Sequence, residues 1–172
     1  MSLFSRLFGH SKATRVGGYL YKSVGEAARV PHFFTEMKVP DTLDGRFDML
    51  MLMQSILTEI LMERGQQAVV REMQEQLIRD MDRNLREIGV GDLSVGKQIK
   101  AMGSALLGRQ AAYHKALKDD GPLLEEAIRR NIYGEDEMAP AADLADIART
   151  LHAAWSGLSL DDMQSALPVK LG

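Results

Sequence analysis

Apolar residues recur at intervals of three and four along almost the whole chain, and no run alternates strictly between apolar and polar residues. Intervals of three and four are typical of amphipathic helices, whereas strict alternation is typical of half-buried strands. The pattern therefore predicts an all-α fold, a single-domain helical bundle with three long central helices and shorter flanking helices.

The three long helices are expected at Arg46–Arg64, Gln66–Ile88 and Ser94–Leu117. The first is apolar on all sides in its first half, which predicts a buried, central position. The other two each have one apolar stripe, which includes Leu77 in the second helix and Leu106 in the third. These two leucines are therefore expected to face the core.

Shorter segments with the same periodicity flank the long helices: Tyr19–Ala28, Pro122–Asn131, Ala141–Trp155 and a last helix capped by Ser159–Asp162. A compact, aromatic-rich stretch, Val30–Met37, follows the first of them. The connection to the first long helix is rich in turn-forming residues. It contains Asp41 and Asp44, and either is a favoured residue for capping the helix that follows.

Length and composition limit the class of protein. A chain of 172 residues is long enough to bury a core as one domain. Cysteine is absent, which excludes disulfides, thiolate metal sites and a cysteine nucleophile. No apolar stretch approaches the roughly 20 residues of a membrane-spanning helix, and no secretory signal is visible. A cytoplasmic protein is expected.

Charge is unevenly distributed. The net charge is +4 over residues 1–40, zero over residues 41–118 and −7 over residues 119–172. Such a distribution is explained by pairing within the molecule, by a basic surface for an anionic partner, or by the solvated faces of separate helices.

Residues 1–15 form a basic amphipathic segment, and residues 16–172 are expected to form the helical domain. The apolar and basic side chains of this segment suit weak contact with an anionic membrane or with ribosomal RNA; they are Leu3, Phe4, Arg6, Leu7, Phe8, Lys12 and Arg15. A disordered tail, or one that packs on the bundle, is the alternative. Peripheral attachment to the inner face of the cytoplasmic membrane is thus one possible location.

Gly91–Lys97 has the spacing of a phosphate-binding loop, G-x4-G-K, but Gln98 stands where such a loop needs Ser or Thr to bind magnesium. A helix is expected before it, where a buried strand is required. The alternative reading of Gly89 and Gly91 is a tight helix–helix connection, in which Gly89 ends a helix in the left-handed conformation. A nucleotide site is not expected.

Other candidate chemistry is weak. The four histidines lie far apart in sequence, and none has the Glu-x-x-His spacing of a di-metal site in a bundle; they are His10, His32, His114 and His152. We therefore expect no catalytic, cofactor-binding or metal-binding residue. Methionine is frequent, with eleven residues, and it either fills an irregular core or lines a groove for a varied apolar partner.

Three stretches resemble the ubiquinol–cytochrome c chaperone family, the assembly factors of the cytochrome bc1 complex. They are Asp41–Phe47 (DTLDGRF), Met81–Gly89 (MDRNLREIG) and Gly91–Lys97 (GDLSVGK), and the resemblance runs from about Tyr19 to Asn131. It implies an all-α chaperone domain and supplies no catalytic residues. Because the chain begins almost at the domain, without a targeting sequence or a long leader, it is expected to be a bacterial member.

The resemblance implies a non-enzymatic assembly chaperone for a hydrophobic respiratory subunit, with cytochrome b or another bc1 subunit as its partner. Mitochondrial members bind newly made cytochrome b together with a small partner protein near the ribosomal exit tunnel. A membrane- or ribosome-surface adaptor and a nucleotide-binding protein are the alternatives. Sequence-specific nucleic acid binding is not expected.

The client is expected to bind beside the most apolar helix, where aromatic, methionine and turn residues gather. This predicted surface consists of Phe33, Phe34, Asp41, Asp44, Arg46 and Phe47. Loops on a rigid scaffold are common sites of binding. A purely structural alternative exists, in which Asp44 and Arg46 only cap a helix and form an ion pair.

Overall fold

The computed structural model describes residues 3–87, 89, 91–119, 121–134, 136–165 and 167–169. Side chains are described from residue 12 onward, except those of residues 92, 93, 98, 101 and 102. Every regular element in these ranges is a helix, which confirms the predicted all-α fold. The helices are α1 (Leu3–Ala27), α2 (His32–Thr35), α3 (Leu43–Glu63), α4 (Gln67–Glu87), α5 (Asp92–Leu117), α6 (Leu123–Ile132), α7 (Ala141–Ser156) and α8 (Leu160–Ser165).

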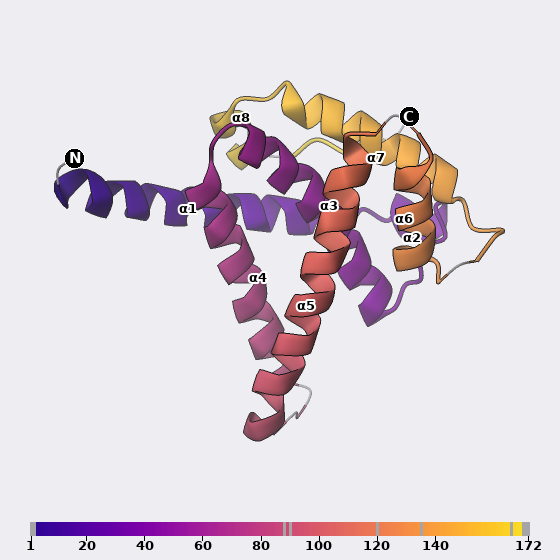
Figure 1. Ribbon diagram of the computed structural model, residues 1–172, viewed down its shortest axis with the longest axis horizontal. Coiled ribbons are helices and arrows are strands. Elements are labelled where there is room, and N and C mark those ends of the chain that lie inside the picture. Colours follow the sequence, from indigo (N-terminus) through magenta and orange to yellow (C-terminus); the bar gives the residue numbers. More distant parts are fainter. Residues whose placement is uncertain are drawn as a thin grey trace.

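Helix α3 lies at the centre of the bundle and contacts α1, α4, α5, α6 and α7 (Figure 1). The side chains of Leu52, Met53, Ile56 and Leu57 have no exposed area. This is the position predicted for a helix that is apolar on all sides. Its Met49 and Met53 belong to the main core, whereas Met62 near its end is 46% exposed.

Helices α4 and α5 project together from the other helices and converge towards a shared end (Figure 1). Between them and α3 lies a small second core, formed by Met51, Leu77, Met81 and Leu106. Leu77 is 2% exposed and Leu106 is 7% exposed. The apolar stripes of both helices therefore face inward as predicted.

Helix α1 differs from the expectation, because it begins at Leu3 rather than near Tyr19 and runs without a break past residue 15. Two adjacent glycines and many polar residues weaken its own pattern, and packing on α4 holds it instead. A Cβ added to Gly17 would lie only 2.7 Å from Cβ of Glu72. Glycine at this position thus allows the two backbones to approach closely.

Helices α6 and α7 pack on α3, and α8 packs on α1. Trp155 of α7 is fully buried, and its indole N–H donates to the carbonyl oxygen of Pro168 at 3.0 Å. The predicted cap of the last helix is present. The Asp162 N–H donates to Oγ of Ser159 at 3.1 Å, and the Ser159 hydroxyl donates to the Asp162 carboxylate at 2.6 Å.

The connection between α4 and α5 contains Gly89, whose φ of 84° is the left-handed conformation expected for a helix stop. Gly91 precedes α5, and residues 92–97 form its first turns. The stretch with phosphate-loop spacing therefore follows a helix and not a strand. Within the described ranges, each helix is too short or too polar to span a membrane.

Candidate functional site

The start of α3 is organised by Thr42, whose side chain accepts a hydrogen bond from the N–H of Gly45 at 3.1 Å. Thr42 is therefore the capping residue, and the expectation of Asp41 or Asp44 in this role is wrong. Thr42 is the residue with extended backbone directly before the helix, where an oxygen can reach the free N–H groups of the first turn. Asp44 lies inside that first turn, where its charge suits the helix dipole.

Gly45 sits where α3 meets the preceding chain. A Cβ added there would overlap the carbonyl oxygen of Pro40. Arg46, the next residue, pairs with Asp41 through Nε and Oδ1 at 2.6 Å, and its guanidinium lies 5.5 Å from the ring centre of Phe34. These contacts tie the turn before α3 to the helix and to the segment around α2.

An apolar hollow of about 280 Å3 opens between the start of α3 and the end of α4. We call it the α3–α4 groove, lined by Leu43, Asp44, Phe47, Met81, Asn84, Leu85 and Glu87. An adjoining hollow of about 270 Å3 shares three of these residues and reaches Arg29 and Arg46. Leu43 is 70% exposed and leaves apolar side-chain area uncovered at this groove.

The predicted client-binding residues do not all reach this surface. Phe33 has no exposed area and belongs to the main core, so in this conformation it contributes no surface to a client-binding site. Phe34 and Phe47 are half-buried, and Asp41, Asp44 and Arg46 are exposed. Of these, Asp44, Arg46 and Phe47 line the two adjoining hollows.

Sequence reasoning did not find the part of the groove contributed by Leu43 and by α4. Met81, Asn84 and Leu85 lie about 40 residues after the start of α3, and only the antiparallel packing of α4 on α3 brings them there. One signal was present in the sequence, since Met81–Gly89 is among the stretches that carry the family resemblance. Their position at the groove gives that stretch a structural location.

Asp48, the residue after Phe47 on α3, is a buried carboxylate that pairs with Nη1 of Arg109 at 2.7 Å. Burial raises the pKa of Asp48 to about 6; Arg109 opposes this shift, and Asp44 adds to it. Asp48 therefore changes charge close to neutral pH.

The predicted membrane- or ribosome-contacting residues lie in the amino-terminal segment, residues 1–15. Lys12 and Arg15 are exposed on α1. The side chains of Leu3, Phe4, Arg6, Leu7 and Phe8 lie outside the described residues. The helix that carries them extends to the left beyond the other helices in Figure 1.

Two of the four histidines converge on Glu59 of α3. Nε2 of His152 lies 2.7 Å from its carboxylate, and His114 lines a cavity beside it. In the described part of the chain, no three His, Cys, Asp or Glu side chains are grouped as a metal ion would require.

Comparison with curated proteins gives no match. The chain is similar to a solved structure described as the crystal structure of the Cbp3 homolog from Brucella abortus. The sequence identity is 27% and the TM-score is 0.81, over 99% of this chain and 97% of that chain. The family model described as ubiquinol-cytochrome C chaperone matches residues 35–169, further towards the carboxyl end than the resemblance seen in the sequence. The chain belongs to the ubiquinol-cytochrome C chaperone family.

Proposed function

We propose that the protein is a non-enzymatic chaperone for assembly of the cytochrome bc1 complex. The observation that carries this proposal is the family match over residues 35–169, supported by similarity to the Cbp3 homolog along nearly the full length of both chains. A chaperone acts by binding, and binding requires a surface that the isolated fold leaves uncovered.

The proposed client is cytochrome b or another hydrophobic subunit of the complex, and the proposed binding surface is the α3–α4 groove. Leu43 is largely exposed there, and half-buried Phe47 adds apolar area. Met81 and Leu85 also line the groove, although they are only 5% and 8% exposed. A methionine beside aromatic and aliphatic side chains suits an apolar segment of variable shape. Asp44 and Glu87, both exposed, add two carboxylates to the lining of the groove.

Capture of the protein from detergent-solubilised host membranes tests the client. We expect cytochrome b to co-purify with the wild-type protein, and its absence would count against the proposal. Leu43→Ser should reduce the yield, because it removes exposed apolar area from the groove. Leu107→Ser on α5 is the matched control, since Leu107 is 61% exposed and lies outside the groove. Equal losses in both variants would show that the groove is not the client site.

The structural alternative for the turn before α3 is tested separately. Phe34→Ala and Arg46→Ala are compared for thermal stability and for crosslinking yield to cytochrome b. Loss of crosslinking with retained stability supports a binding surface. A parallel loss of both would mean that these residues only hold the turn in place.

We also propose that residues 1–15 strengthen peripheral attachment to an anionic surface, either the inner face of the cytoplasmic membrane or the ribosome. Lys12 and Arg15, which are exposed in the amino-terminal half of α1, favour this role. Deletion of the segment should weaken co-sedimentation with anionic vesicles or with ribosomes and leave the thermal midpoint nearly unchanged. Raised salt should weaken it as well. Co-sedimentation that survives both changes would exclude the segment as the attachment site.

A further inference from the structure

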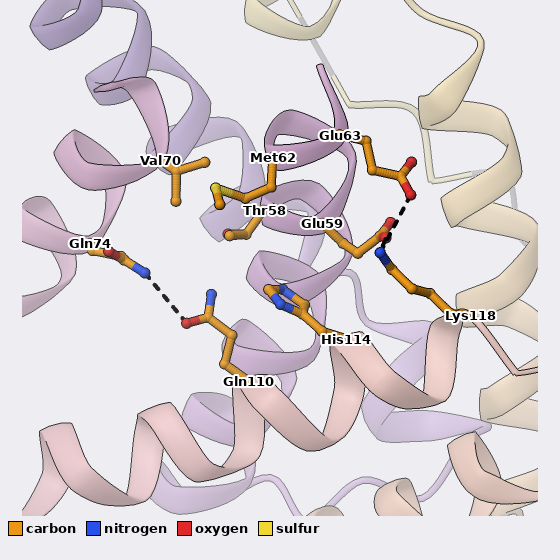
Figure 2. A pocket seen from close by; sticks show the side chains of 9 residues that line it. All are labelled: Thr58, Glu59, Met62, Glu63, Val70, Gln74, Gln110, His114 and Lys118. Atoms are coloured by element: carbon orange, nitrogen blue, oxygen red, sulfur yellow. Dashed lines mark hydrogen bonds and ion pairs between the residues drawn. The ribbon is translucent and has the colours of Figure 1, made fainter. Parts of the chain in front are cut away.

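A second hollow, distinct from the α3–α4 groove, lies between α3, α4 and α5. We call it the Glu59 cavity; its volume is about 430 Å3. Figure 2 shows Met62 and Val70 on one side and Glu59, Glu63 and Lys118 on the other. Gln74 of α4 donates to Gln110 of α5 at 3.4 Å and bridges the two projecting helices beside it.

Glu59 is a charged group held inside the bundle, because its side chain is only 3% exposed. Its two oxygens meet Nζ of Lys118 at 3.1 Å and Nε2 of His152 at 2.7 Å. Burial by itself would raise the pKa of the carboxyl, but the hydrogen bonds from His152 and Lys118 outweigh it and lower the pKa below its ordinary value. The cavity therefore keeps a permanent carboxylate at its wall.

The other polar groups of the cavity include hydrogen-bond acceptors. Nε2 of His114 lies 3.2 Å from the carbonyl oxygen of Ser55; since a carbonyl only accepts, Nε2 carries the hydrogen. Burial lowers the pKa of His114, so the ring is neutral and its Nδ1 is an acceptor. Thr58 is 2% exposed, and its buried Oγ1 has no hydrogen-bond partner within the protein.

Among the side chains that line the cavity, carboxylates outnumber ammonium groups. Glu59 and Glu63 share one ammonium group, since Nζ of Lys118 lies 3.1 Å from the first and 3.6 Å from the second. Burial lowers the pKa of His114, so this ring adds no charge, and the side chains that line the cavity carry two carboxylates and one ammonium group. Lys118 is 61% exposed and Glu63 is 57% exposed, and exposed ion pairs of this kind are weak enough to be displaced. A second cation can enter without leaving a charge buried and unpaired.

The apolar wall adds a second requirement. Met62 is 46% exposed at the cavity, and Val70 lies beside it. A carboxylate next to an aliphatic wall fits a side chain with an alkyl stem and a cationic head. A free metal ion would gain nothing from Met62 and Val70, and an anion would be repelled by the excess carboxylate.

We propose that the Glu59 cavity binds one lysine or arginine side chain presented by a partner polypeptide. This inference rests on the proposed function, because a membrane-embedded client carries an excess of Lys and Arg in its loops on the cytoplasmic side. The α3–α4 groove would then hold an apolar segment of the client, and the Glu59 cavity a basic residue from a flanking loop.

Binding is tested with single-residue probes on the full-length protein, by nuclear magnetic resonance of methyl-labelled methionines. N-acetyl-L-arginine amide and N-acetyl-L-lysine amide should shift the Met62 methyl signal in a saturable way. N-acetyl-L-citrulline amide has nearly the shape of arginine without its charge, and it should bind about tenfold more weakly. Met138 is 92% exposed between α6 and α7; it does not line the cavity and should not respond. Equal shifts with citrulline, or equal shifts at Met138, would overturn the inference.

Variants separate a binding site from a merely structural ion pair. Glu63→Gln should weaken arginine binding about two- to fivefold, and Lys118→Met should tighten it by a similar factor because the competing internal cation is gone. Glu75→Gln is the matched control for Glu63→Gln, since Glu75 is 52% exposed and also pairs at the helix surface. Lys118→Met without tighter binding would overturn the inference, provided that its melting curve shows a folded protein. If Lys118→Met is unfolded, the comparison of Glu63→Gln with Glu75→Gln tests the inference. Equal arginine binding by these two variants would then overturn it.

Client capture then distinguishes this inference from the proposed function. If the wild-type protein captures cytochrome b and Glu63→Gln captures as much, the chaperone role stands. The proposed contact with a basic residue of the client is then overturned. If the arginine and lysine probes bind as expected but the wild-type protein does not capture cytochrome b, cytochrome b is not the client. Its flanking loop is then not the occupant of the cavity. Reduced capture by Glu63→Gln, with Glu75→Gln unchanged, supports both.

Discussion

Gly45 offers a direct test of how the start of α3 is built, because two physical effects oppose each other there. Gly45 lies within a helix, where replacement by alanine ordinarily stabilises by about 0.5–1 kcal/mol through backbone entropy. The added Cβ, however, would overlap the carbonyl oxygen of Pro40. A backbone atom cannot rotate away as the end of a flexible side chain can.

Overpacking of this kind costs about 1–3 kcal/mol, and a backbone obstacle places Gly45→Ala in the upper part of that range. After subtraction of the helix-propensity gain, we expect a net loss of about 1–2 kcal/mol in the free energy of unfolding. Gly108→Ala is the matched control, since Gly108 is an exposed residue inside α5 and a Cβ there would meet nothing within 4 Å. That variant should gain about 0.5–1 kcal/mol.

Urea denaturation of the wild-type protein and both variants, followed by circular dichroism, measures these free energies. Opposite signs for the two substitutions are the expected result. If Gly45→Ala were as stabilising as Gly108→Ala, the chain around Pro40 would not press against α3. The assignment of glycine at this position to a close backbone approach would then be refuted.

Three further outcomes are expected. Leu77→Ala and Leu106→Ala should each cost about 2–5 kcal/mol, because both truncate the small core between α3, α4 and α5; losses below about 1 kcal/mol at both would show that this core is not packed as described. Asp48→Asn should alter the pH dependence of stability. The pKa of Asp48 is raised to about 6 in the folded state, so the folded protein binds this proton more tightly than the unfolded chain does. The free-energy cost of burying the charged carboxylate is therefore present at pH 7 and is lost as the pH falls through 6. The stability of the wild-type protein relative to Asp48→Asn should therefore rise by roughly 2 kcal/mol between pH 7 and pH 4.5, and a flat difference would show that Asp48 titrates normally. Isothermal titration with magnesium–ATP should give no heat of binding, because Gln98 lacks the magnesium-binding hydroxyl; micromolar affinity that disappears in Lys97→Ala would contradict this.

The sequence predicted the three long helices because their signals are local. Helix α3 is apolar all round for two turns, and the stripes of α4 and α5 repeat every three or four residues over more than five turns. Such patterns fix both the element and the face that it buries. The predicted start of α3 was three residues late, since Leu43 is exposed and so contributes nothing to the buried stripe.

The features that were missed depend on contacts between distant residues. Helix α1 extends to Leu3, and Gly17 in its middle is explained only by the close approach to Glu72 of α4. Glu59 is surrounded by apolar residues in the sequence, and its partner His152 lies 93 positions later. No local sequence pattern predicts that a buried carboxylate accepts hydrogen bonds at this position. Phe33 and Phe34 are adjacent, and only the tertiary fold decides that the first is buried and the second is partly exposed.

The two proposed contacts with a client are linked by α3 itself. Leu43–Phe47 lines the groove and Glu59–Glu63 lines the cavity, and these stretches are 16 residues apart on one helix. At a rise of 1.5 Å per residue this is about 24 Å along the helix axis. An extended chain needs about seven residues to cover that distance. A client that occupies both sites must therefore present its apolar stretch and its basic residue at least that far apart, a spacing that the end of a membrane segment and its flanking loop can supply.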